Sequence, residues 1–90
     1  MSHTARTKQK LLARVRRLRG QIEAVERALE GDVACDQVMH LIAGIRGATS
    51  GLMAEVVEDH VRSHIATEAE PGARTRAAED LIEVVHTYLR

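Results

Sequence analysis

The 90-residue sequence contains one cysteine, one proline and one tyrosine, and it has no phenylalanine or tryptophan. One cysteine cannot form a disulfide within the chain, which leaves a buried filler, a reactive thiol or a metal ligand as its role. Without large aromatic side chains, a chain of this length can build only a thin core from aliphatic residues and alanine. We therefore expect a single domain over residues 1–90 that completes its core by forming a homo-oligomer.

Long apolar runs are also missing from the sequence. No stretch of about 18 apolar residues could span a membrane, and the basic N-terminus lacks the apolar segment of a secretory signal. We therefore expect a cytoplasmic protein. Enzyme motifs are absent as well, because HVRSH lacks the internal glutamate of zinc proteases and there is no glycine-rich phosphate loop. The sequence indicates a protein that is not an enzyme.

Acidic residues are missing from the first 20 positions, although the whole chain balances 13 basic Lys and Arg residues against 13 acidic ones. Such a cationic segment is typical of proteins that bind phosphate groups, but it also occurs as a solvated helix face that acids of a neighbouring subunit balance. Charge alone leaves both interpretations open. On the first, the residues that contact phosphates are Lys8, Lys10, Arg14, Arg16, Arg17 and Arg19.

Apolar residues recur at helical spacing in three segments, and no strand pattern occurs. The spacing predicts a long helix from about Thr4 to Glu30, a second long helix capped by Asp32 and ending near Thr67, and a short third helix. The third helix follows a connector over residues 68–72, and residues 1–8 are expected to form a flexible N-terminal arm. The predicted fold class is all-α, with a three-helix protomer.

Two histidines, His60 and His64, lie one turn apart in the second predicted helix and can bind one metal ion, but a complete site needs about four to six ligands. Cys35 is the best further donor, because thiolate and imidazole together suit zinc, nickel or cobalt. At 100° per residue Cys35 lies within roughly 20° of the histidine stripe, yet 25 residues at about 1.5 Å each separate it from His60 by roughly 37 Å. One chain cannot close this site.

Two antiparallel copies of the second helix would bring Cys35 of one subunit beside His60 and His64 of the other, and a two-fold dimer would contain two such sites. His3 is the expected fourth donor, and removal of Met1 would place the α-amine of Ser2 beside it. A metal that binds His3 would also reposition the basic segment that follows. Three glycines on the other side of the helix are assigned to packing against the first helix or another dimer: Gly44, Gly47 and Gly51.

Several segments of the chain form a distinctive combination. They are MSHT at the N-terminus, VRRLRGQIEAVERALEG, Cys35 after a helix break, and IRGATSGLMAEVVEDH leading to His64. Together they resemble the CsoR/RcnR family of small transcriptional repressors over essentially the whole chain. The resemblance implies antiparallel four-helix-bundle dimers that assemble as a dimer of dimers. It also implies that this tetramer binds double-stranded operator DNA without metal and releases it when metal binds.

Within that family, the ligands His3, Cys35, His60 and His64 are similar to those of the nickel- and cobalt-responsive branch. This implies Ni(II) or Co(II) as the effector, with Zn(II) as an alternative, and a metal efflux gene as the target. Some nickel and cobalt relatives have glutamate where this chain has Ala34 and Ser63, which leaves the metal preference open. Formaldehyde-responsive relatives share the cysteine and usually have proline at position 2. A formaldehyde response through Cys35 and the N-terminal amine is the alternative function.

Overall fold

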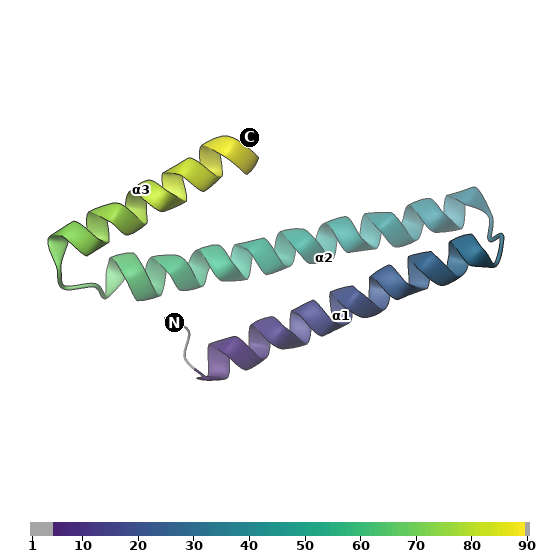
Figure 1. Ribbon diagram of the computed structural model, residues 1–90, viewed down its shortest axis with the longest axis horizontal. Coiled ribbons are helices and arrows are strands. Elements are labelled where there is room, and N and C mark those ends of the chain that lie inside the picture. The colour runs from purple at the N-terminus through teal and green to yellow at the C-terminus, as the bar shows by residue number, and fades with distance from the viewer. Residues whose placement is uncertain (1–4, 90) are drawn as a thin grey trace.

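The computed structural model describes residues 5–89, which form three α-helices and no strand. Helix α1 spans Ala5–Glu30 and helix α2 spans Cys35–Val61; α2 continues into a π-helical turn, η1, over Arg62–Ala66. Helix α3 spans Pro71–Tyr88. Figure 1 shows α1 and α2 as an antiparallel hairpin, with α3 folded back from the far end of α2. The predicted all-α, three-helix protomer is therefore confirmed.

The turn between α1 and α2 differs from its prediction, because Asp32 does not cap α2. Asp32 has a φ of 61° and ends α1 in the left-handed conformation, which Asp tolerates better than most residues. The amide of Val33 donates to the carbonyl oxygen of Ala28 at 3.0 Å, which is the bond expected where a helix ends in this way. Ala34 occupies the N-cap of α2 and makes no side-chain capping bond.

The end of α2 agrees with its prediction, since η1 stops at Ala66 and Thr67 follows as its C-cap. The next helix begins earlier than expected, within the predicted connector. Pro71 is its first residue, a position where the missing amide hydrogen costs nothing. The Glu70 carboxylate caps α3 by accepting bonds from the amides of Gly72 at 2.9 Å and Ala73 at 2.6 Å.

The predicted N-terminal arm over residues 1–8 overlaps the start of α1. The structure places residues 5–8 inside the helix, so these four residues are helical rather than part of an arm. They contain no proline or glycine that would interrupt the helical pattern. His3 and Ser2 lie outside the described residues.

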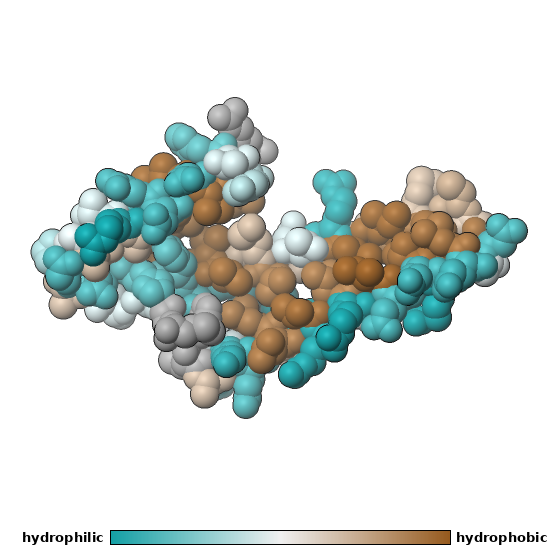
Figure 2. Space-filling model, in the orientation of Figure 1, coloured by the Kyte–Doolittle hydropathy of each residue, from teal (hydrophilic) through white to brown (hydrophobic). Residues whose placement is uncertain are grey.

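The protomer is thin, with principal extents of 55 × 30 × 13 Å, and its buried hydrophobic residues within 5–89 are Ala28 and Ala77. The apolar residues of α1 alternate along the helix between half-buried and exposed positions. The half-buried ones are Leu11, Leu18 and Val25. The exposed ones have exposed fractions of 42% for Val15, 53% for Ile22 and 64% for Leu29. Figure 2 shows apolar side chains in a band over α1 and α2 across the middle of the molecule. One protomer therefore leaves much of its apolar surface uncovered.

Two of the three glycines of α2 face α1. A Cβ at Gly44 would lie 3.8 Å from Nε2 of Gln21, and one at Gly51 would lie 3.0 Å from an Nη of Arg14. A Cβ at Gly47 would meet no atom within 4 Å. The expected packing against the first helix is therefore seen at Gly44 and Gly51. Within residues 5–89, no helix combines the length and apolar character needed to cross a membrane.

Candidate metal and DNA-binding sites

His60 and His64 lie together at the junction of α2 and η1, as their spacing predicts. Their ring centroids are 5.2 Å apart with the ring planes inclined by 48°, and both residues are half-buried. His60 is in the last turn of α2 and His64 is in η1, so the pair bridges the change from α- to π-helical turns. Such π-helical turns occur frequently at functional sites. The arrangement brings two imidazole rings close enough to bind the same metal ion.

The ring of His60 is oriented by helix α3. Its Nε2 lies 2.8 Å from the backbone carbonyl oxygen of Ala77, a buried residue of α3. A carbonyl oxygen only accepts, so Nε2 carries the hydrogen, and in the neutral imidazole Nδ1 then keeps its lone pair. Metal-binding histidines commonly donate their other ring N–H to a carbonyl or carboxylate in this way. The bond therefore prepares Nδ1 of His60 to act as a metal ligand.

Cys35 lies at the opposite end of α2. It is the first residue of that helix, it is exposed, and it is a free thiol. Because α2 is continuous from Cys35 to Val61, the helical rise separates Cys35 from His60 by about 37 Å. Among residues 5–89, no three His, Cys, Asp or Glu side chains come together in a group that could hold a metal ion. Within one protomer, the structure thus brings together His60 and His64 but not Cys35.

The donor chemistry nevertheless fits a transition metal. The histidine pair offers imidazole nitrogens and Cys35 offers sulfur, a set that suits zinc, nickel or cobalt better than calcium or magnesium. Within residues 5–89 the histidine pair has ligands of the right kind but no third ligand close enough to complete the site. A complete site requires donors from another chain or from the residues before Ala5.

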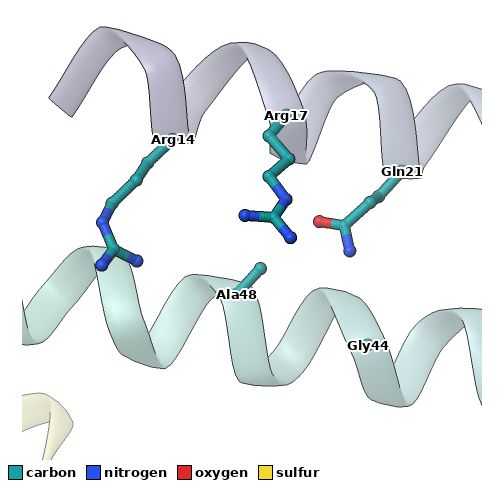
Figure 3. Close-up of a pocket in the computed structure, with 5 residues that line it drawn as sticks. All are labelled: Arg14, Arg17, Gln21, Gly44 and Ala48. Carbon is teal, nitrogen blue, oxygen red and sulfur yellow. The ribbon is translucent and has the colours of Figure 1, made fainter. Parts of the chain in front are cut away.

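The six basic residues predicted to bind DNA all lie on α1 and are all exposed. Arg14 and Arg17 project toward α2, where they line a cleft of about 260 Å³ with Gln21, Gly44 and Ala48. Figure 3 shows both guanidinium groups reaching from α1 across to α2. Lys10, Arg14 and Arg17 recur at helical spacing on one flank of α1, here called the basic face, and this face borders the α1–α2 groove. The remaining four predicted residues are Lys8, Lys10, Arg16 and Arg19.

Glu55 of α2 was not among the predicted functional residues, but it contacts this basic face. Its carboxylate lies 3.3 Å from an Nη of Arg14 and 3.9 Å from Nζ of Lys10. The Arg14 contact is also a hydrogen bond of the same length. Two of the six predicted DNA-binding cations are thus paired with one carboxylate inside the protomer.

Comparison with known proteins connects these features to one family. Residues 7–87 match the family model described as "Metal-sensitive transcriptional repressor". The chain is 52% identical to an uncharacterized protein in the bioA 5' region of Serratia marcescens, over 100% of both chains. It is 38% identical to the transcriptional repressor RcnR of Salmonella paratyphi B, again over 100% of both chains.

A solved structure gives the same assignment from the fold. A glutamate-to-histidine variant of the formaldehyde-responsive regulator FrmR, from Salmonella enterica serovar Typhimurium, superposes with a TM-score of 0.88. The two chains are 40% identical, and the match covers 96% of this chain and 98% of the other. The members of the matched family are DNA-binding repressors rather than enzymes. The sequence and the helical fold together show that this chain belongs to the metal-sensitive transcriptional repressor family, also called the CsoR/RcnR family.

Proposed function

We propose that this protein is a nickel- or cobalt-responsive repressor that binds operator DNA without metal and releases it on metal binding, so that a metal efflux gene is expressed. Such a protein acts on DNA in the cytoplasm. The observation that carries the proposal is the histidine pair, in which the bond to Ala77 leaves Nδ1 of His60 available as a ligand. Zn(II) suits the same donors and is the alternative effector.

The proposed metal site is shared between two subunits. One face of α2 carries Cys35 near its start and His60 near its end. Three apolar residues lie on the same face between them and are exposed to 59% at Met39, 45% at Ile42 and 38% at Val56. An apolar stripe between the two ends of the ligand face is suited to pack against a second copy of α2. If the copies run antiparallel, Cys35 of each subunit meets the histidine pair of the other. Such a dimer is a four-helix bundle, and two dimers form the proposed tetramer.

His3 is proposed as the fourth ligand, with the α-amine of Ser2 as a further donor. His3 lies two positions before the first residue of α1, and α1 carries all six proposed DNA-binding residues. A ligand contributed by His3 would thus connect the metal site to the basic helix. This would link metal binding to a change in DNA affinity. By linkage, the DNA-bound protein must then bind the metal less tightly than the free protein does.

The shared site is tested by mixing two inactive variants. Cys35→Ala subunits and His60→Ala/His64→Ala subunits each lack one half of every site, so neither homodimer should bind cobalt with native affinity. In the mixed dimer, one site keeps the Cys35 of one subunit and both histidines of the other. Cobalt absorption spectra should therefore recover in the mixture to half the native amount per mixed dimer. No recovery would count against a site built from two subunits.

A formaldehyde response is the second candidate function, and two observations favour it. The thiol of Cys35 is exposed at the start of α2, and the solved relative with a TM-score of 0.88 is a formaldehyde-responsive regulator. The two functions are separated by measuring DNA release with formaldehyde, nickel and cobalt added singly. Release by low formaldehyde, but by neither metal, would reject the metal proposal.

A further inference from the structure

Glu55 is directed at the basic face of α1 from the neighbouring helix. Its side chain is 28% exposed, whereas those of the paired Arg14 and Lys10 are 42% and 66% exposed. The carboxylate is therefore the less exposed partner of a small charge cluster at the helix interface. Arg17 lines the same cleft as Arg14 but has no carboxylate partner among residues 5–89.

A carboxylate and a phosphate compete for the same guanidinium hydrogens, because both are oxyanions that accept hydrogen bonds from arginine. Lys10 and Arg14 are two of the six residues proposed to contact DNA. To bind phosphates fully, they must give up or share the contacts that they make with Glu55. Breaking each contact with Glu55 costs free energy, so DNA binding is less favourable than it would be without Glu55.

We propose that Glu55 is an internal competitor for DNA phosphates, which holds the operator affinity of the metal-free protein below the highest value that α1 could reach. The inference rests on the proposed repressor function and adds a residue that regulates it. A repressor that must release its operator benefits from moderate affinity, because a given metal-driven change then empties more of the sites. Glu55 would supply that adjustment from α2, the helix that also carries His60.

The expected effect is modest because the cluster is partly exposed. Exposed ion pairs contribute little in water, and the loss of this competition corresponds to about a two- to fivefold increase in DNA affinity. Each cation freed by the loss of Glu55 should also steepen the dependence of affinity on salt by about 0.9 in the log–log slope. A residue with a purely structural role would not produce this second change.

Glu58 provides a matched control. It lies one turn further along α2, but its carboxylate pairs with Arg62 of the adjoining turn at 2.9 Å rather than with the α1 cations. Glu55→Gln and Glu58→Gln therefore remove the same charge from neighbouring positions. Among residues 5–89, the Glu55→Gln variant breaks ion pairs between α2 and α1, whereas Glu58→Gln breaks a pair within α2 and its adjoining turn.

The experiment measures the dissociation constants of the wild type, Glu55→Gln and Glu58→Gln for a duplex of the protein's own promoter region, over a range of salt concentrations. We expect Glu55→Gln to bind about two- to fivefold more tightly than Glu58→Gln, with a steeper salt slope. Equal affinities, or weaker binding by Glu55→Gln, would overturn the inference while leaving the repressor proposal intact. Failure of the wild type to bind any such duplex would overturn both.

A second pair of variants guards against an indirect effect on folding. In an Arg14→Gln background, the gain from Glu55→Gln should shrink, because the main cation that Glu55 holds is already absent. An undiminished gain would show that Glu55 acts through something other than this pair and would overturn the inference. Circular dichroism and sedimentation of each variant report whether helix content and oligomeric state are retained.

Discussion

Nε2 of His60 donates a hydrogen bond to the carbonyl oxygen of Ala77, so one candidate metal ligand also connects α2 to α3. His64, one turn further on, makes a ring contact with His60. The two histidines are therefore expected to share a role in metal binding but to differ in their contribution to stability.

Replacing each histidine by alanine should separate these roles. Both variants should lose metal binding, but His60→Ala should also lower the free energy of unfolding of the metal-free protein by about 1 kcal/mol, through the lost bond to α3. His64→Ala should cost less. Denaturant unfolding without metal measures the difference, and equal losses for the two variants would contradict it.

Cys35→Ser should affect metal binding without affecting the fold. The thiol is exposed in the protomer, so the free energy of unfolding of the metal-free protein should stay within about 0.5 kcal/mol of the wild-type value. Losing a ligand should cost more than the 10- to 100-fold in metal affinity that is typical when a ligand loses its supporting hydrogen bond. Competition with a chelator measures the affinity. Native metal affinity in this variant would show that Cys35 is not a metal ligand.

DNA binding through the basic residues of α1 should be strongly salt-dependent. If the six predicted cations of a subunit each neutralise one phosphate, the slope of log affinity against log salt should be about −5 for each subunit that contacts duplex DNA, and less steep where Glu55 holds Lys10 and Arg14. Replacing Arg16 or Arg19 by glutamine should reduce its magnitude by about 0.9 each. Fluorescence anisotropy over a range of salt concentrations measures the slopes. An affinity that does not change with salt would assign these residues to another role.

The N-cap of α3 should contribute measurably to stability. The carboxylate of Glu70 accepts bonds from two amides that no residue within the helix can satisfy. Glu70→Ala should therefore destabilise the protein by about 1 kcal/mol, the usual cost of losing a cap. Glu70→Asp, with a shorter carboxylate that is common at N-caps, should retain part of the effect. Unchanged stability of the alanine variant would show that water replaces the cap.

Apolar spacing was enough to predict three helices and the approximate ends of the first two, because their periodic segments are long. The role of Asp32 was mispredicted because Asp suits both a helix N-cap and a left-handed helix end, and local sequence does not rank the two. The π-helical turn that holds His64 has no distinct sequence pattern, since it differs from an α-helix by one extra residue in the hydrogen-bonded ring.

The distance between Cys35 and the histidine pair could be predicted because it depends only on helical rise. The contact of His60 with Ala77 could not, since it involves a backbone atom of a helix whose position is set by the connector. The contact between Glu55 and Lys10, by contrast, could have been predicted from the sequence. In a helical hairpin, residues equally far from the turn lie opposite each other, and Lys10 and Glu55 are such a pair, as are Gln21 and Gly44.

The sparse interior has a consequence for any measurement of heat stability. Within the described residues, Ala28 and Ala77 are the buried hydrophobic residues. An isolated subunit therefore gains little free energy from burying apolar surface, and association of subunits should supply much of the stability. Unfolding and dissociation are then expected to occur as one event. The melting temperature should rise as the sample is concentrated, so variants are comparable only at matched subunit concentration.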